Sequence, residues 1–403
     1  MNYREAIDWL FSTQMFGIKL GLDGPRRLLK EYLAHPAHGV KVIHIAGTNG
    51  KGSTCAMIDS VARAGGVRTG LFTSPHLVDF RERIRVSGAE VPEDVCAHML
   101  SELRQICEKQ EHHPTFFEIA LALAMRWFRE RECECIILET GMGGRLDATT
   151  AVPADVCGIT PIGLDHTQWL GETLAEIARE KAGIMVEGKP VISSPQHPEA
   201  ARVLEMEANE TRSPLKFVTE PVLGYPIALT GEHQQWNAAL ALECLHAAGY
   251  RPNYETVLYG LSSVRWPGRF EITQVGDRIV VFDGAHNPAS AEVLAQTWHS
   301  VYKAEKAALV FSAVATKDLP GIVKHLEPLA ATAHVCPVDS ARTLSVDELA
   351  GAFAGEVTCH ENAEQAFAAA LEDGTKVLVA GSIFLSGEIK ARLESGEWRS
   401  TQQ

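Results

Sequence analysis

One stretch limits what this chain can fold into more than any other, the run KVIHIAGTNGKGST at residues 41–54. Residues 42–46 are apolar apart from His44 and predict a buried strand, and residues 47–53 predict a glycine loop that opens a helix. Glycines let the backbone turn so that successive N–H groups point into one concavity, and the helix start adds a partial positive charge. The stretch therefore predicts a phosphate-binding loop within a parallel α/β sheet.

The side chains of this loop suit a bound nucleoside triphosphate. Lys51 offers a mobile cation to the outer phosphate oxygens, and hydroxyls such as that of Thr54 can bond a phosphate or a metal ion. The predicted nucleotide-binding residues of the loop are Gly47, Thr48, Asn49, Gly50, Lys51, Gly52 and Ser53. The run departs from the pattern G-x-x-x-x-G-K-[ST], because Ile45 replaces the first glycine and Gly52 replaces the hydroxyl residue. The alternative is a glycine-rich turn that binds nothing.

Composition limits the remaining possibilities. A chain of 403 residues is too long for one ordinary core and suits two domains. The net charge of −14 argues against a nucleic-acid partner. No apolar run is long enough to cross a bilayer, and the first residues lack a secretory signal, so we expect a cytoplasmic protein with no membrane partner. The nine cysteines form no C-x-x-C pair and are expected to be reduced and structural.

Two further strands of the first half end in polar residues. The apolar run at residues 135–138 leads directly into Glu139, and an acid at that position can hold Mg²⁺ against a nucleotide. The run at residues 155–160 leads to Asp165 and His166. Because parallel strands end at the same edge of a sheet, we expect these residues to lie near Lys51. The alternatives are a solvated carboxylate at Glu139 and a structural Asp–His pair.

A helix predicted at residues 172–185 carries a lysine on its apolar stripe. Lys181 lies seven residues after Leu174 and four after Ile177, so it faces inward. A buried lysine needs a partner or loses its charge. One interpretation is a pair with a nearby glutamate; the other is that the neutral amine takes up carbon dioxide and becomes a carbamate able to hold a metal ion.

Two other features of the first half suggest ligand contacts. The run FRERIRVSGAEVP places Arg81, Arg83 and Arg85 at alternating positions, which predicts one side of a strand in a short flap. That side either faces an anionic substrate or is a solvated edge. Farther on, the amide of Asn237 at the start of a helix can read the polar edge of adenine, with structural capping as the alternative.

The second half restarts the strand–helix alternation after residues 266–271. Strands are predicted at residues 278–282, 307–311, 333–336, 356–359 and 376–380, which indicates a second parallel sheet of doubly wound type. Its first strand leads into Asp283 and His286. The sequence therefore predicts an α/β protein of two domains, at residues 1–267 and 268–403.

Five separated strings together resemble one family, the folylpolyglutamate synthases and dihydrofolate synthases, which are related to the Mur cell-wall ligases. The strings are GTNGKGS, TSPHL with its arginine flap, ETGMGGRLDATT, IGLDHTQWLGETLAEIAREKAGI, and WPGRFE followed by DGAHNP. The resemblance implies an N-terminal ATPase domain of phosphate-loop type and a C-terminal Rossmann-like glutamate ligase domain. It also implies a monomer.

The same resemblance implies roles for individual residues. Ser74 and Glu139 would hold one Mg²⁺ ion, and Glu139, His166 and a carbamylated Lys181 would hold a second. The residues expected to approach ATP, besides the loop, are Asn237, Arg269 and Asp283. His286 would lie on the amino-acid side of the site. The expected catalytic set is Lys51, Lys181, His166, His286 and Asp283.

The implied reaction is an ATP-dependent ligation. A substrate carboxylate attacks the γ-phosphate to give an acyl phosphate and ADP, and the amine of L-glutamate then displaces phosphate. The expected acceptors are reduced folates and dihydropteroate, because HTQWLG resembles the bifunctional enzymes. After TFFE the family commonly has a threonine, whereas this chain has the run 119–122, IALA, so the choice of pterin stays open.

Three rival interpretations are weaker. A Mur-type ligase would add an amino acid to a cell-wall precursor, but the flap TSPHLVDFRERIRVSG speaks against it. A nucleotide-binding module without ligase chemistry would hydrolyse ATP regardless of glutamate. A dinucleotide oxidoreductase is disfavoured because no G-x-G-x-x-G follows the first strand of the second half.

Overall fold

The structure is a computed structural model that describes residues 1–17, 21–340 and 342–396. The chain divides into two compact units. The first comprises Met1–His76, Phe80–Ala228 and Gln235–Val264, and the second comprises Leu77–Asp79, Leu229–Gln234 and the chain from residue 265. Both are mixed α/β units, which confirms the predicted fold class. The domain boundary between residues 267 and 268 stays a prediction.

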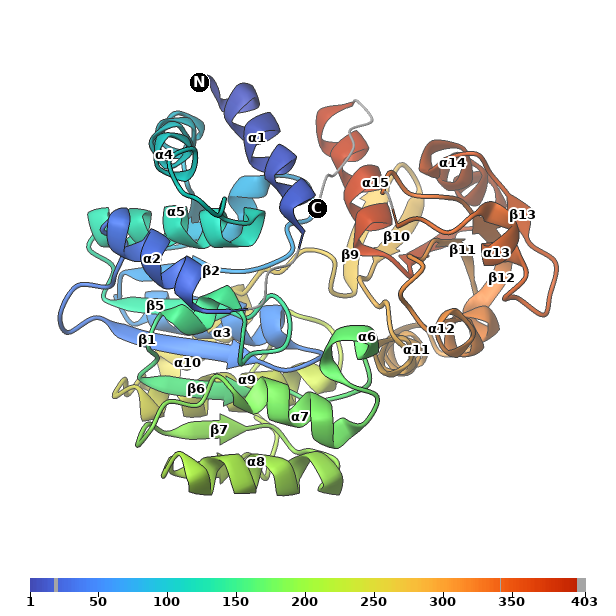
Figure 1. Ribbon diagram of the computed structural model, residues 1–403. Coiled ribbons are helices and arrows are strands. Elements are labelled where there is room, and N and C mark those ends of the chain that lie inside the picture. Colours follow the sequence, from blue (N-terminus) through green and yellow to red (C-terminus); the bar gives the residue numbers. More distant parts are fainter. Residues whose placement is uncertain (18–20, 341, 397–403) are drawn as a thin grey trace. The chain divides into compact units, whose positions relative to one another are not determined.

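The first unit is built on an eight-stranded sheet with the order β4-β3-β2-β5-β1-β6-β7-β8 (Figure 1). Its strands are β1 Lys41–Ala46, β2 Thr69–Phe72, β3 Ile84–Val86, β4 Ala89–Glu90, β5 Cys135–Glu139, β6 Val156–Ile159, β7 Val191–Ser193 and β8 Leu215–Phe217. All pair in parallel except the β3–β4 hairpin, which extends the sheet from β2 in antiparallel fashion. The central strands β1, β5 and β6 are almost wholly buried, which is why their sequences read as continuous apolar runs.

Helices cover both faces of this sheet. They are α1 Tyr3–Ser12, α2 Asp23–Glu31, α3 Lys51–Ala64, α4 Glu93–Cys107, α5 Phe116–Glu130, α6 Thr167–Leu170, α7 Leu174–Ala182, α8 Pro198–Glu210, α9 His233–Ala247 and α10 Tyr254–Ser263, with 3₁₀ turns η1 Thr13–Phe16, η2 Phe80–Arg83 and η3 Ala148–Ala151. Helix α3 packs on β1, β2 and β5, and α10 packs on α3. Val42 and Ala46 of β1 share one apolar cluster with α5, on the other face.

Local sequence signals set the helix starts that matter for the site. Helix α5 begins with a capping box of Thr115 and Glu118, and α7 begins with one of Thr173 and Glu176. Helix α3 instead begins after Gly50, whose left-handed backbone (φ 89°) only glycine adopts readily. The phosphate loop therefore turns directly into the helix without a capping side chain.

The second unit has a six-stranded sheet with the order β13-β12-β11-β14-β10-β9 (Figure 1). Its strands are β9 Glu271–Val275, β10 Arg278–Phe282, β11 Ala307–Phe311, β12 Ala330–Val335, β13 Thr358–Cys359 and β14 Lys376–Ala380. Its helices are α11 Pro288–Tyr302, α12 Leu319–Leu326, α13 Val346–Ala350, α14 Ala363–Asp373 and α15 Ile383–Ser395, with η4 at Glu327–Leu329. Helices α11 and α12 line one apolar cluster, and α14 and α15 line the other.

Two local predictions were wrong or incomplete. Arg81 and Arg83 lie in η2, and only Arg85 lies in a strand, so the three arginines do not form one side of a strand. The reason is that pairing with β2 begins only at Ile84. Strand β9 was not predicted, because its alternating half-buried residues mark a short antiparallel edge strand with a weak apolar signal.

Among the described residues, no helix combines the length and the apolar character needed to span a membrane.

Candidate active site

The phosphate loop follows β1 at the carboxyl edge of the first unit's sheet. Gly47 has φ 143°, and a side chain there would collide with the hydroxyl of Thr160. A Cβ atom on Gly50 would lie 2.6 Å from Oδ1 of Asn237. Both glycines are therefore required by close neighbours as well as by backbone conformation, and Asn237 is placed directly beside the loop.

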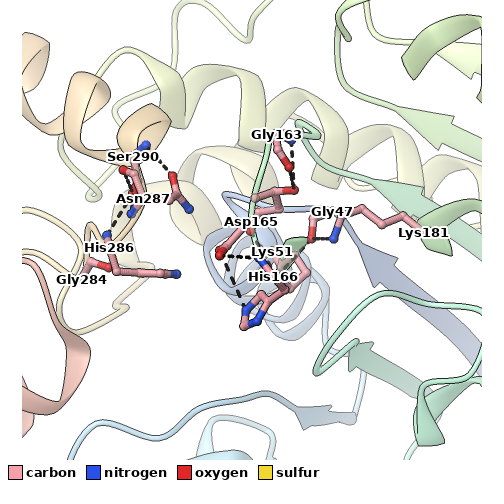
Figure 2. Close-up of polar contacts among 11 residues, drawn as sticks. Gly47, Lys51, Gly163, Asp165, His166, Lys181, Gly284, His286, Asn287 and Ser290 are labelled. Carbon is pink, nitrogen blue, oxygen red and sulfur yellow. Dashed lines mark hydrogen bonds and ion pairs between the residues drawn. The ribbon is translucent and has the colours of Figure 1, made fainter. Parts of the chain in front are cut away.

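Part of the loop is held by the segment that follows β6. The N–H groups of Thr48 and Asn49 donate to the carbonyl of Pro161 (3.0 and 3.3 Å). The Thr48 hydroxyl donates to the carbonyl of Gly163 and accepts from its N–H, both at 3.0 Å (Figure 2). These contacts fix the loop against the neighbouring strand end, and the nucleotide contact predicted for Thr48 stays a prediction.

The first turn of α3 supplies the remaining loop groups. Its first helical hydrogen bond runs from Thr54 N to Gly50 O (2.9 Å), so the N–H groups of Lys51, Gly52 and Ser53 precede the helical ladder. Unbonded N–H groups at a helix start attract anions. The arrangement suits phosphate oxygens.

Two lysines meet at the loop. Lys51 Nζ donates to the carbonyls of Gly47 and Thr48, each at 3.2 Å. Lys181 Nζ, from α7, donates to the same Gly47 oxygen at 2.8 Å (Figure 2). Lys181 is only 4% exposed, which confirms the prediction that it faces inward.

The environment of Lys181 disfavours its charge. Burial, and then the charge of Lys51, lower the pKa of the Lys181 amine to about 7, while Asp165 and Asp147 oppose the shift. Among the described residues, no ion pair joins Lys181 to a glutamate, and its hydrogen bond goes to the Gly47 carbonyl. A substantial fraction of the amine is therefore neutral and nucleophilic near neutral pH.

Glu139 ends β5 beside this loop. It pairs with Ile45 of β1 and is 4% exposed, so the alternative of a solvated carboxylate is wrong. Its Oε2 accepts a hydrogen bond from the backbone N–H of Ser74 (3.0 Å), which follows β2. The structure thus brings together two of the predicted metal ligands, Ser74 and Glu139.

His166 lies at the N-terminus of α6, with a left-handed backbone (φ 52°). Its N–H donates to Asp165 Oδ1 (2.8 Å), and its ring Nε2 lies 3.9 Å from Asp165 Oδ2 (Figure 2). Within the described ranges, no three His, Cys, Asp or Glu side chains are arranged to hold a metal ion. The predicted metal ligands are of other types as well, because they include a serine, Ser74, and a carbamylated lysine, Lys181.

A buried polar chain that sequence reasoning missed supports the segment after Glu139. The Thr149 hydroxyl donates to Asp147 Oδ1 (2.5 Å) and lies 2.8 Å from His44 Nε2 on β1. Asp147 Oδ2 also accepts from Met142 N (2.9 Å). Burial lowers the pKa of His44 to about 3, so this ring is neutral. The available signal was a histidine within an otherwise apolar strand.

The second unit gathers the other predicted residues at the end of β10. Asp283 accepts from the N–H groups of Phe270 and Ala285, both at 2.8 Å. Burial raises the pKa of the Asp283 carboxyl, and the charge of Arg269 opposes that shift. His286 Nδ1 lies 2.7 Å from the Gly284 carbonyl, which requires a proton on Nδ1 and leaves Nε2 as the ring's acceptor when the ring is neutral (Figure 2).

Comparison with known proteins identifies both halves of the chain. Residues 45–191 match the Mur ligase middle domain, and residues 268–383 match the Mur ligase glutamate ligase domain. The chain is 33% identical over 430 residues to the dihydrofolate synthase/folylpolyglutamate synthase of Bacillus subtilis, covering 97% of this chain and 99% of that protein.

Comparison with solved structures leads to the same family. Escherichia coli FolC in complex with DHPP and ADP superposes with a TM-score of 0.89 at 31% identity, covering 97% of this chain and 98% of that one. A bifunctional folylpolyglutamate synthase/dihydrofolate synthase with Mn, AMPPNP and L-glutamate bound gives a TM-score of 0.85 at 28% identity, covering 96% and 98%. The chain therefore belongs to the dihydrofolate synthase/folylpolyglutamate synthase family of ATP-dependent ligases, which is built from Mur ligase domains.

Proposed function

We propose that this protein joins L-glutamate to the carboxylate of dihydropteroate and of reduced folates, with release of ADP and phosphate. Family membership supports the ligase reaction, and the similar structures contain ADP, DHPP or L-glutamate. The observation that carries the proposal is the meeting of Lys51 and Lys181 on the Gly47 carbonyl beside the buried Glu139. A triphosphate and a hard cation need this combination of cations, N–H groups and a carboxylate.

In the first step, a carboxylate oxygen of the acceptor attacks the γ-phosphorus of ATP. The bond from that phosphorus to the bridging oxygen breaks, and ADP leaves. Lys51 turns from its two carbonyls to the phosphate oxygens and offsets the charge that gathers there, together with the N–H groups of the first turn of α3. This chemistry is mainly positioning and electrostatic stabilisation.

In the second step, the neutral amine of L-glutamate attacks the acyl phosphate through a tetrahedral intermediate, and phosphate leaves. His286 is proposed to contact the amino acid. With Nδ1 bonded to the Gly284 carbonyl, its Nε2 is the atom able to accept a proton from the amine. Asp283 holds the backbone of Phe270 and Ala285, and we propose that with Arg269 and Asn237 it completes nucleotide binding.

Two Mg²⁺ ions are proposed, and the residues present fit them. Ser74 and Glu139 offer oxygen ligands for one ion. Glu139, His166 and a carbamate on Lys181 would hold the second. The carbamate forms when the neutral amine attacks carbon dioxide and releases one proton, which the lowered pKa of Lys181 favours. When bound, such ions offset charge on the transferred phosphoryl group.

Several finer assignments belong to the same proposal. The protein is proposed to act as a monomer in the cytoplasm, without a nucleic-acid or membrane partner. Residues 1–267 are proposed as the ATP-binding domain and residues 268–403 as the glutamate ligase domain, in line with the matched ranges 45–191 and 268–383.

The test is incubation with ATP, Mg²⁺, L-glutamate and either dihydropteroate or tetrahydrofolate, with products measured by mass. The expected products carry one added glutamyl residue, with one ADP and one phosphate each. ATP hydrolysis that ignores glutamate contradicts the proposal. A nucleotide-linked cell-wall peptide serves as the control acceptor and should not react.

A further inference from the structure

A buried arginine in the flap lacks the carboxylate partner that such a residue normally needs. Arg83 ends η2 and is 4% exposed. Its Nε donates to Nδ1 of His76 (2.7 Å), and its guanidinium lies over the ring of Phe116, 5.1 Å from the centroid. Within the described part of the chain, these are the hydrogen bond and the cation–π contact of its side chain, and neither partner is an anion. Burial lowers the pKa of Arg83 only to about 10, so it stays charged.

The two neighbouring arginines of the flap, unlike Arg83, have carboxylate partners. Arg81 Nη2 lies 3.4 Å from Glu93 Oε1, and Arg85 Nη2 lies 3.4 Å from Glu90 Oε1. The two arginines with carboxylate partners are thus the less buried ones. A buried charge without a hydrogen-bonded counter-ion costs roughly several kcal/mol, so the presence of Arg83 in the interior calls for an explanation. A bound anion that pairs with the guanidinium supplies one.

The location of Arg83 indicates which anion pairs with its guanidinium. Its carbonyl accepts from Thr73 N (3.0 Å), and the next residue, Ser74, donates from its N–H to Glu139 (3.0 Å). The charges of Glu82 and then of Glu139 favour the charged form of Arg83 and raise its pKa. The guanidinium therefore belongs to the same end of β2 and β5 as the proposed metal ligands, where the acceptor carboxylate must meet the γ-phosphate.

The two rings that contact Arg83, those of Phe116 and His76, pack against further aromatic rings. Phe116 lies 5.2 Å from Phe11 and 6.0 Å from Phe80 between ring centroids, and His76 lies 6.1 Å from Phe11. A guanidinium next to aromatic side chains can pair with a carboxylate while those side chains pack on an aromatic ring that carries it. Dihydropteroate, a benzoate-type acid, has this chemistry.

We propose that Arg83 binds the acceptor carboxylate of the pterin substrate and aims it at the γ-phosphorus. This inference rests on the proposed function. One carboxylate oxygen pairs with the guanidinium, while the other forms the new bond to phosphorus as the bond to the bridging oxygen breaks and ADP leaves with the electron pair. The guanidinium fork fixes the plane of the carboxylate, and the aromatic rings hold the ring behind it.

The test measures dissociation constants for dihydropteroate and for its analogue without the carboxylate, in the presence of Mg²⁺ and ADP. The wild type should prefer dihydropteroate by at least about tenfold, as expected for a buried charge pair. In Arg83→Gln this preference should fall toward one, with ADP affinity unchanged. The matched control Arg85→Gln should keep the preference, because Arg85 already pairs with Glu90.

The outcomes separate the two proposals. A preference that survives in Arg83→Gln overturns the role of Arg83 and leaves the ligase function standing. A wild type that binds neither compound overturns both. If Arg83→Gln fails to bind ADP because it does not fold, Arg83→Lys is measured instead; it should show a reduced preference, since an ammonium lacks the planar fork, and an unchanged preference again overturns the role.

Discussion

Lys51 and Lys181 donate to one acceptor, the carbonyl oxygen of Gly47, at 3.2 and 2.8 Å. Burial, and then the nearby charge of Lys51, lower the pKa of the Lys181 amine to about 7. The shared carbonyl thus joins the phosphate loop to the helix that carries the proposed carbamate.

The first prediction concerns pH. Because the pKa of folded Lys181 lies below the ordinary lysine value of 10.5, its neutral form is gained as pH rises through about 7. Roughly a tenth of the amine is neutral one unit below that pKa and roughly nine tenths one unit above it. Enzyme depleted of carbon dioxide should therefore regain activity on adding bicarbonate more fully at pH 8 than at pH 6. Equal recovery at both values contradicts a carbamate on Lys181.

The second concerns removal of that lysine. Lys181→Ala should abolish turnover, and short carboxylic acids such as formate or acetate should partly restore it by taking the place of the carbamate. Activity is measured as glutamate-dependent ADP release. The control is Lys189→Ala, which removes only a surface pair with Asp155 (3.1 Å) and should keep its activity without any acid. Full activity of Lys181→Ala contradicts the role.

The third concerns the loop glycines. Gly50→Ala should weaken ATP binding by about tenfold or more, because the new Cβ would meet Asn237 Oδ1 at 2.6 Å and shift either the loop or the amide. Gly188→Ala is the control: it also has a positive φ, 71°, but nothing within 4 Å of the added atom. It should lose stability without losing ATP affinity. Similar ATP affinities in the two variants would argue against the contact with Asn237.

The sequence predicted the strand–loop–helix unit, the inward lysine and the acid at the end of β5, because each leaves a local signal. It could not predict which flap arginine is buried, since that depends on where β3 begins to pair with β2. It also missed the contact between His44 and Thr149, 105 residues apart in sequence, which only the packing of η3 against β1 creates. Contacts between distant segments leave no periodic pattern to read.

The fourth prediction concerns this missed contact. Thr149→Val should lower the free energy of unfolding by about 1–3 kcal/mol, because it leaves the His44 N–H unpaired and removes one donor from the buried Asp147. Urea denaturation measures the loss. The control Thr150→Val removes a hydroxyl bonded to the Gly144 carbonyl (2.7 Å) in a less buried position and should cost less. Equal losses of unfolding free energy in the two variants would contradict a larger stabilising contribution from the hydrogen bonds of Thr149.

The central claim is that the acceptor carboxylate attacks the γ-phosphate directly. Dihydropteroate labelled with ¹⁸O in its carboxylate tests it, because a single turnover with ATP, Mg²⁺ and L-glutamate must pass one carboxylate oxygen to the released phosphate. The account predicts one ¹⁸O atom in each phosphate, seen by mass spectrometry or by the isotope shift in ³¹P NMR. Phosphate free of label, or label found in AMP, would contradict it.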